Sequence, residues 1–279
     1  MIYYNDFDQK SIAWLNELIK EGLIPKGRVD GRPIQEVNNY ELFGYTTAHF
    51  FAGIGGWAHA LQLAGWPQGL PVWTGSCPCQ PFSAAGRRKG IEDERHLWPF
   101  FRELIAKCAP PVIFGEQVAS KLGREWLAGV RADLETLGYA VGAADLCAAG
   151  VGAPHIRQRL FWVAVAKGIG LQESREKQGY SSEAPSGDDG MGNASRSGLH
   201  RDNRREPGQE PKNRHSWSDS LFIYCRDKKY RRVPLEPSLF PLAPRIQGRV
   251  GLLRGAGNAI VPQVAAEFIK AVNEVLHLY

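Results

Sequence analysis

Residues 70–83 read Leu-Pro-Val-Trp-Thr-Gly-Ser-Cys-Pro-Cys-Gln-Pro-Phe-Ser, an apolar run followed by a turn rich in proline. An apolar run that ends in such a turn is typical of a buried strand carrying a loop at its carboxyl end. Open α/β sheets form their active sites at the carboxyl ends of their strands. This stretch therefore predicts an α/β fold with a functional loop at residues 78–83.

Cys79 is the candidate nucleophile of this loop. It lies between Pro78 and Pro81, whose rings restrict the backbone on either side and so direct the thiol. A buried spare thiol is the alternative. A zinc site on Cys77 and Cys79 is not expected, because the sequence has no second Cys pair and no nearby His cluster to complete the ligand set.

Length and composition are those of a globular protein. The 279 residues, 43% of them hydrophobic, suffice for a full α/β core and one small accessory region. No apolar stretch approaches the ~18 residues that a membrane span requires, and the N-terminal residues lack the layout of a signal peptide. Five cysteines without framework spacing are typical of a reducing compartment. We expect a cytoplasmic protein with no membrane partner.

The positive charge is concentrated in one segment. The chain has a net charge of +5, and residues 194–232 alone hold 11 Lys or Arg against five Asp or Glu. A solvated polar loop is one interpretation of this composition. A basic segment attached to a balanced core is also typical of nucleic-acid binding.

A Gly-rich turn precedes the predicted nucleophile loop. Residues 46–56, Thr-Thr-Ala-His-Phe-Phe-Ala-Gly-Ile-Gly-Gly, predict a strand, a turn and the start of a helix that ends at Gly65. Glycines in such a turn let the backbone approach a ligand, and the helix N-terminus offers free N–H groups. A tight turn without a ligand is the alternative.

Two later strands are expected to bring charged side chains to the same region. Residues 111–118 predict a buried strand that places Glu116 just past its end, where the carboxylate enters the cleft or, alternatively, caps a helix or faces solvent. Residues 160–166 predict another buried strand, preceded by Arg157 and Arg159. In an extended backbone, alternation places these two arginines on the same side; a solvated pair is the alternative.

Composition divides the chain into three parts. Residues 1–166 are expected to form an α/β domain, with amphipathic helices near 10–21, 94–108 and 120–137. Residues 167–244 are polar and loop-rich, partly disordered over 167–214, with a small β unit at 221–225 and 230–233. Residues 245–279 return to the α/β domain and close it with a helix opened by Gly257-Asn-Ala-Ile-Val-Pro.

Taken in order, these motifs resemble those of the C5-cytosine DNA methyltransferases. Residues 51–56 resemble the family's S-adenosylmethionine-binding motif, and residues 78–83 resemble its catalytic loop. Residues 116–118, 155–159 and 257–262 resemble its Glu-Asn-Val, Gln-x-Arg-x-Arg and Gly-Asn motifs. Gln117 and His155 replace the Asn and Gln of two of these motifs, and both can still form hydrogen bonds. The resemblance implies a Rossmann-like methyltransferase sheet with helices on both faces and a small, irregular or β target-recognition region.

One stretch of the chain is shorter than the family requires. Only 28 residues separate Phe51 from Cys79, too few for the two strand–helix units that the family carries there. Residues 4–8, Tyr-Asn-Asp-Phe-Asp, resemble the family's Asn-Glu-x-Asp segment, and Val29-Asp30 resembles the motif that follows it. We predict that the second and third strand units lie at the N-terminus, in a sheet ordered third, second, first, fourth. An N-terminal decoration beside an open cofactor pocket is the alternative.

The resemblance implies methyl transfer from S-adenosylmethionine to C5 of a cytosine flipped out of duplex DNA. Cys79 would add as a thiolate to C6 of the base. Glu116 would hold N3 and the exocyclic amine and supply a proton. Arg159 would bind O2, and Arg157 would support the loop or a phosphate.

The resemblance also implies the binding residues. Asp6 would bond the ribose hydroxyls of the cofactor, Phe7 would stack on its adenine, and Asp30 would reach the adenine amino group. The other cofactor-binding candidates are Phe51, Ala52, Gly53, Ile54, Gly55, Gly56, Pro78, Asn258 and Ala259. The DNA-binding candidates, which include part of the basic segment, are Gln80, Ser83, Arg204, Arg205, Arg231 and Arg232.

Double-stranded DNA is the expected partner of a monomer, and a restriction–modification role would add a cognate restriction endonuclease. Three alternatives stay open. An RNA cytosine C5-methyltransferase would use the same core. A non-catalytic DNA-binding relative is expected to lack Cys79 or Glu116, and both are present. A thiol redox protein using Cys77 and Cys79 would leave Glu116 and the Gly-Asn motif unexplained.

Overall fold

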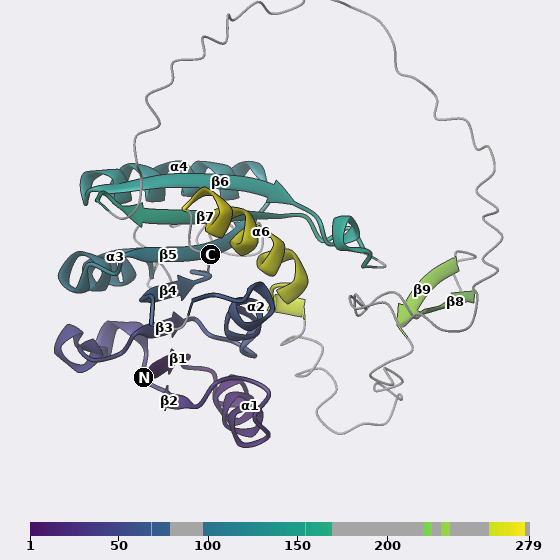
Figure 1. The fold of residues 1–279 in the computed structure, drawn as a ribbon, viewed down its shortest axis with the longest axis horizontal. Helices are drawn as coiled ribbons and strands as arrows, with labels where there is room; N and C mark the ends of the chain where they lie inside the picture. The colour runs from purple at the N-terminus through teal and green to yellow at the C-terminus, as the bar shows by residue number, and fades with distance from the viewer. Residues whose placement is uncertain are drawn as a thin grey trace, which may run out of the picture. The chain divides into compact units, whose positions relative to one another are not determined.

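The computed structural model describes residues 1–67, 69–78, 97–153, 155–168, 220–224, 230–234 and 257–276. These residues form a seven-stranded sheet with helices on both faces and a two-stranded hairpin (Figure 1). The chain forms two units, Met1–Leu171 with Ser216–Tyr279, and Gln172–His215. The second unit and almost all of the predicted loop-rich segment lie outside the described residues.

The elements follow the predicted alternation of strands and helices. The strands are β1 (Ile2–Asn5), β2 (Gly27–Asp30), β3 (Thr47–Phe50), β4 (Val72–Gly75), β5 (Val112–Val118), β6 (Tyr139–Leu146), β7 (Arg159–Ala166), β8 (Ser220–Tyr224) and β9 (Tyr230–Pro234). The helices are α1 (Gln9–Lys20), α2 (Gly56–Ala64), α3 (Trp98–Cys108), α4 (Lys121–Thr136) and α6 (Pro262–Val275), with 3-10 turns η1 (Ile34–Glu36), η2 (Asn39–Leu42) and η5 (Ala148–Val151).

The strand order confirms the predicted rearrangement of the sheet. The seven strands lie in the order β2-β1-β3-β4-β5-β7-β6, and the first five are parallel. β7 is antiparallel to both of its neighbours. The N-terminal strand β1 therefore pairs with β3, which precedes the Gly-rich turn, and β2 forms the edge. This is the third, second, first, fourth arrangement expected for the family strands.

Helix ends follow from their local sequences. The Asp8 side chain accepts a hydrogen bond from the Lys10 N–H at the start of α1, and Ser120 accepts one from the Gly123 N–H at the start of α4. α2 ends at Gly65, whose φ of 67° favours glycine. Pro262 starts α6, where a missing N–H costs nothing.

Alternation along the parallel strands separates two apolar layers. Tyr3, Ala48 and Trp73 face a layer completed by α3 and α4. The opposite face of the sheet packs against α2 and α6, and Tyr4 packs with α1 on that same side (Figure 1). The predicted arrangement with helices on both faces is therefore confirmed.

The carboxyl ends of the parallel strands form one transverse row. Asn5 pairs with both Asp30 and Phe50, Phe50 pairs with Gly75, and Gly75 pairs with Gly115. The residues that follow β1, β2, β3 and β4 leave the sheet at the edge where α/β proteins bind ligands, whereas β5 continues to Val118. The register therefore aligns the ends of four strands with Gly115 of β5.

The local predictions differ from the structure at two of the candidate residues. Glu116 does not follow the strand; it lies inside β5, which continues to Val118 because it pairs with β7 over its whole length. The backbone at Arg157 is not extended, because its φ is +36°. Alternation therefore does not place Arg157 beside Arg159.

The small β unit predicted at 221–225 and 230–233 is confirmed as a hairpin over 220–224 and 230–234, and Cys225 lies outside the described residues. β8 and β9 pair antiparallel, and the rings of Tyr224 and Tyr230 lie 5.0 Å apart between centroids. Within the described part of the chain, none of the helices has the length and apolar character needed to cross a membrane.

Candidate functional site

The candidate site begins one residue beyond the transverse row. Asp6, Phe51 and Ser76 follow the last residues of β1, β3 and β4, and Glu116 follows Gly115 within β5. The row is closely packed underneath. A Cβ on Gly115 would lie 2.1 Å from Trp162 Cζ2, and one on Gly75 would lie 2.5 Å from Phe101 Cε1. Glycine at both positions therefore leaves room for the rings of Trp162 and Phe101 to pack against the strands that carry the site.

The Gly-rich turn after β3 has the backbone that its sequence predicts. Phe51, Gly53 and Gly55 have φ angles of 52°, 54° and 79°, a region that favours glycine. A Cβ on Gly56 would lie 2.8 Å from Ile260 Cγ1. Glycine is therefore needed where α2 meets the segment that leads into α6.

Asp6 connects the N-terminal strand to this turn. Its Oδ2 accepts the Gly53 N–H at 2.8 Å, and its Oδ1 accepts the Asp8 N–H at 2.9 Å. Burial raises the pKa of the Asp6 carboxyl, while these two hydrogen bonds act in the opposite direction. The following residue, Phe7, is 62% exposed. A carboxylate and an exposed ring thus lie beside the Gly-rich turn, as a nucleoside-containing cofactor would require.

Asp30 lies at the end of β2 as predicted, but its carboxylate already has partners. Tyr3 donates its hydroxyl to Oδ2 at 2.9 Å, and Arg32 Nη2 lies 2.5 Å from the same oxygen. Burial raises the pKa of Asp30, but hydrogen bonds from Arg32 and Tyr3 outweigh it and hold the pKa at about 2. No local pattern of residues predicted the pairing of Asp30 with Arg32, and contact of Asp30 with adenine stays a prediction.

Glu116 and Arg159 form an ion pair at the β5 end of the row. Arg159 Nε lies 2.9 Å from Glu116 Oε1, and Glu116 is 8% exposed. Burial raises the pKa of Glu116, although Arg159 and Arg157 attract the ionised form. A buried carboxyl with a raised pKa beside a guanidinium can both accept and donate hydrogen bonds to a flat, polar ring.

Two residues that the sequence did not single out as functional complete this cluster. The Ser76 hydroxyl forms a hydrogen bond with the Glu116 carboxylate, and Trp57 Nε1 donates to Ser76 Oγ at 3.0 Å. Trp57 is the second residue of α2, directly after the Gly-rich turn. The parallel alignment of 70–76 with 111–116 could have placed Ser76 beside Glu116, because Gly75 and Gly115 pair.

Gln117 holds the start of the predicted nucleophile loop. Its Nε2 donates to the Cys77 carbonyl at 3.2 Å, and its Oε1 accepts the Val118 N–H at 3.0 Å. The exchange of the motif's Asn for Gln therefore preserves a hydrogen-bonding role. Pro78 is half-buried after this anchor. Cys79, Gln80 and Ser83 lie outside the described residues.

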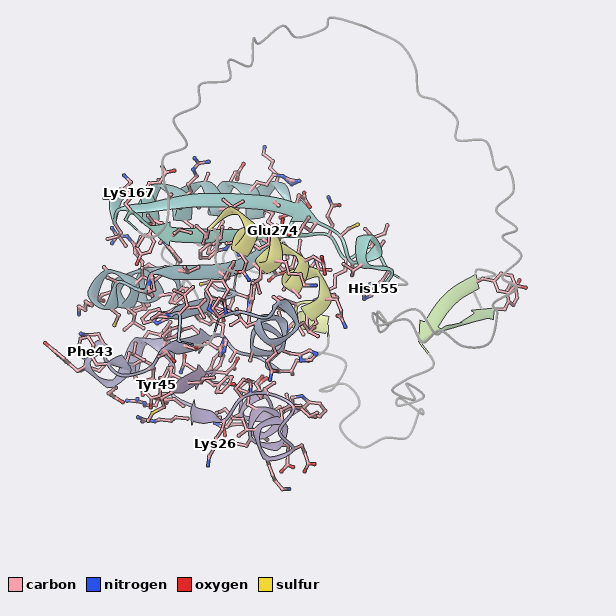
Figure 2. The ribbon with its side chains drawn as sticks, in the orientation of Figure 1. Lys26, Phe43, Tyr45, His155, Lys167 and Glu274 are labelled. Carbon is pink, nitrogen blue, oxygen red and sulfur yellow. The ribbon has the colours of Figure 1, made fainter. Side chains whose placement is uncertain are left out.

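Arg157 points to the C-terminal motif rather than beside Arg159. Its Nη2 donates to the carbonyl of Gly257 at 2.8 Å and also to the carbonyl of Ala259. Asn258 is exposed between them. Burial lowers the pKa of Arg157, and neighbouring Arg159 lowers it further. Arg157 therefore connects the turn before β7 with the predicted closing motif, and His155 lies in that same turn (Figure 2).

The DNA-binding candidates are not brought to this site by the described residues. Arg231 and Arg232 lie in β9, opposite Ile223 and Phe222 of β8. Arg204 and Arg205 belong to the part of the chain that is not described. Among the described residues no group of three or more His, Cys, Asp or Glu could hold a metal ion.

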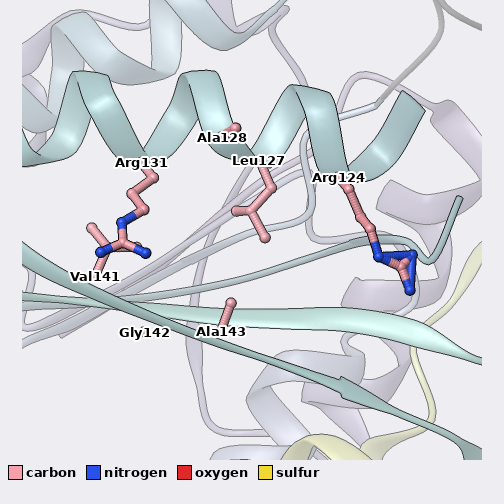
Figure 3. Close-up of a pocket in the computed structure, with 7 residues that line it drawn as sticks. All are labelled: Arg124, Leu127, Ala128, Arg131, Val141, Gly142 and Ala143. Atoms are coloured by element: carbon pink, nitrogen blue, oxygen red, sulfur yellow. The ribbon is translucent and has the colours of Figure 1, made fainter. Parts of the chain in front are cut away.

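A cleft elsewhere in the molecule does not include the candidate site. It lies between α4 and β6, has a volume of about 220 Å³, and contains none of the predicted functional residues (Figure 3). Two of its lining residues are already neutralised, since Arg124 pairs with Asp145 and Arg131 with Glu135, each at 2.6 Å. The chemistry of the predicted residues therefore belongs to the transverse row and not to this cleft.

Two Type II methyltransferases are similar to parts of this chain. M.AplI of Arthrospira platensis, a Type II methyltransferase, is 40% identical over 95 residues, which are 33% of this chain and 28% of that protein. M.HhaI of Haemophilus parahaemolyticus, another Type II methyltransferase, is 26% identical over 49% of this chain and 54% of its own length. The chain thus spans at most about half of these two relatives.

Among solved structures, a DNMT2 variant of Spodoptera frugiperda superposes with a TM-score of 0.43 and 16% identity, covering 64% of this chain and 46% of that one. The model of the C-5 cytosine-specific DNA methylases matches residues 67–221, more than half of the chain. This match includes the predicted nucleophile loop, the Glu116 strand and the two arginines. The chain therefore belongs to the C-5 cytosine-specific DNA methylase family.

Proposed function

We propose that this protein transfers a methyl group from S-adenosylmethionine to C5 of a cytosine in duplex DNA. One observation carries the proposal: the Glu116–Arg159 pair and the Gly-rich turn lie on the same row of strand ends. One sheet would thereby hold both a site for a polar base and a site for the cofactor. Family membership supports the same reaction.

The base would be held by the ion pair. A carboxyl with a raised pKa retains its proton more readily, so Glu116 could donate to N3 of cytosine while accepting from the exocyclic amine. Arg159 would donate to O2. Because the carboxyl lies inside a sheet rather than in a surface loop, its position varies little, as catalysis by proton transfer requires.

The residues around the Gly-rich turn fit S-adenosylmethionine. The turn between Phe51 and Gly56 can approach the cofactor closely, Asp6 can accept from ribose hydroxyls, and the exposed Phe7 ring can stack on adenine. Asn258 and Ala259 would close the pocket, held by Arg157. The cofactor supplies an electrophilic methyl group.

Cys79 would provide the covalent step. Its thiolate would form an S–C6 bond, and the displaced electron pair would make C5 nucleophilic as N3 takes up a proton. C5 would take the methyl group while the S–CH3 bond of the donor breaks and its electron pair stays on sulfur. Loss of the C5 proton to a base, release of the thiolate from C6 and return of the N3 proton to Glu116 would restore the ring.

Duplex DNA is the substrate that charge and family favour. Residues 194–232 carry most of the excess positive charge and would neutralise phosphates and read bases. A base inside a duplex is inaccessible to the row, so the target cytosine would be flipped out. A cognate restriction endonuclease and a monomeric state stay predictions.

Transfer of a radiolabelled methyl group to duplex DNA tests the proposal, with Cys79→Ala assayed in parallel and products digested to nucleosides. We expect 5-methylcytosine from the wild type, and a loss of at least about 10³-fold in Cys79→Ala. S-adenosylmethionine binding by the variant should be nearly unchanged.

Three outcomes would contradict the proposal. Labelling of structured RNA but not of a pooled genomic DNA would move the substrate to RNA. Labelling of neither, in a protein that binds S-adenosylmethionine and DNA, would identify a non-catalytic relative. Equal labelling by Cys79→Ala would exclude the covalent step.

A further inference from the structure

Ser76 occupies a position set by strand register. Gly75 of β4 and Gly115 of β5 pair in the parallel sheet, so the next residues along the two chains, Ser76 and Glu116, are neighbours. The Ser76 hydroxyl forms a hydrogen bond with the Glu116 carboxylate. Ser76 is therefore both the residue after β4 and a direct partner of the acid.

The donor on the other side of Ser76 determines the direction of this bond. Trp57 Nε1 lies 3.0 Å from Ser76 Oγ, and an indole nitrogen can only donate. Ser76 Oγ therefore accepts the hydrogen bond from Trp57, and its own hydroxyl can donate a hydrogen bond to Glu116. The carboxylate thus receives the hydroxyl of Ser76 and the Nε–H of Arg159, the latter at 2.9 Å on Oε1.

The position of Trp57 is set by the helix that follows the Gly-rich turn, where the cofactor is predicted to bind, and by contacts of its ring. It is the second residue of α2, directly after the Gly-rich turn, and it is 4% exposed. Its ring contacts Phe114 and Phe161, with centroid distances of 6.1 Å to each. The hydrogen-bonded chain from Trp57 through Ser76 and Glu116 to Arg159 therefore runs from the predicted cofactor turn to the predicted base site.

We propose that Ser76 is a positioning residue that aligns Glu116 for cytosine, acting within the chain Trp57–Ser76–Glu116–Arg159. This proposal rests on the proposed function of the site. The chain makes the orientation of the acid depend on the position of the helix that begins at the cofactor turn. Neither Ser76 nor Trp57 needs to touch the substrate for this role.

The test combines Ser76→Ala, Ser76→Thr and Trp57→Phe with two readouts. The first is titration of the Glu116 carboxyl by ¹³C NMR of glutamate-labelled protein, with the signal assigned by Glu116→Gln. The second is kcat and the KM values for S-adenosylmethionine and DNA. Thr136→Ala is the matched control, because its hydroxyl bonds only the Ala132 carbonyl on the exposed side of α4.

We expect Ser76→Ala to raise the pKa of Glu116, since a donor to the ionised form is lost. We also expect it to lower kcat by about 10- to 100-fold with little change in either KM, because the acid loses its alignment. Ser76→Thr should keep the pKa of Glu116 and kcat at their wild-type values, because it retains the hydroxyl. Trp57→Phe should have an intermediate effect on kcat. Thr136→Ala should change neither.

Three results would overturn the proposal. An unchanged pKa of Glu116 in Ser76→Ala would mean that the hydroxyl does not act on the acid. Equal losses in Ser76→Ala and Ser76→Thr would assign the effect to packing. Wild-type values in Trp57→Phe would remove Trp57 from the chain. The titration needs no activity, so a wild type that transfers no methyl group would fail the proposed function and leave the contact still tested.

Discussion

At the scale of single residues, Arg157 combines an unfavourable backbone with two strong bonds. Its φ of +36° lies in a region that costs a non-glycine residue about 1–2 kcal/mol. This conformational cost is offset by the hydrogen bonds that the guanidinium donates to the carbonyls of Gly257 and Ala259. Strain offset by contacts to a motif 100 residues away is typical of a functional position.

Arg157→Ala should therefore weaken cofactor binding more than it weakens the fold. Loss of hydrogen bonds from a charged donor corresponds to about 10-fold in affinity for S-adenosylmethionine. Isothermal titration calorimetry measures this directly, and Gln158→Ala, at an exposed neighbouring side chain, is the control. An affinity equal to that of the wild type would show that the closing motif does not depend on Arg157.

At the scale of elements, an ion-pair network joins β2 to the turn that returns the chain to β3. Arg32 contacts Asp30 at 2.5 Å and Glu41 of η2 at 2.6 Å. Asp30 has a side chain that is 4% exposed. The segment between β2 and β3 exists because β3 follows β2 in this chain. The ion pairs of Arg32 hold this segment against the edge strand β2.

Arg32→Ala should destabilise the protein by about 2 kcal/mol, because it leaves a buried carboxylate without its main partner. Arg28→Ala should cost less than about 1 kcal/mol, since Arg28 is 51% exposed and lies 4.0 Å from Asp30. Urea unfolding at pH 7 compares the two variants. Equal losses of stability in the two variants would show that Arg32 is not the main partner of Asp30.

The same network gives a pH dependence. The folded-state pKa of Asp30, about 2, lies below the usual aspartate value of 3.8. Its contribution to stability is complete above pH 4 and is lost as the pH falls towards 2. The stability difference between wild type and Arg32→Ala should therefore narrow over that interval.

At the scale of the whole molecule, the N-terminal segment is part of the central sheet and not an added decoration. β1 lies between β2 and β3, and Asp6 at its end binds the Gly53 N–H in the Gly-rich turn. The alternative of a decoration beside an open pocket is therefore wrong as a description of the fold. The cofactor roles of Asp6 and Phe7 stay proposals.

Asp6→Ala should weaken S-adenosylmethionine binding by about 10-fold or more, since it removes an acceptor for the ribose and a support of the turn. DNA affinity should change little. Asp8→Ala is the matched control: it removes the α1 N-cap and should lower stability by about 1 kcal/mol without changing cofactor affinity. Unchanged cofactor affinity in Asp6→Ala would contradict the proposed role of the rearranged strand.

Much of the fold could be predicted from local sequence, because its signals are local. Apolar runs that end in glycine or proline marked β3, β4 and β5, and helix caps such as Ser120 and Gly65 marked helix ends to within about one residue. The order of the first four strands followed from motif resemblance and was confirmed. Glu116 was placed past its strand because pairing with β7, which extends β5 to Val118, is not encoded nearby.

The sequence by itself determined the elements, the motifs and therefore the family. Only the tertiary structure decided which atoms meet: Arg157 with the carbonyls of Gly257 and Ala259, Arg32 with Asp30, and Ser76 with both Trp57 and Glu116. The physical reason is that these contacts depend on the register between strands and on one left-handed φ. Both are settled by long-range packing, which no local pattern of residues reports.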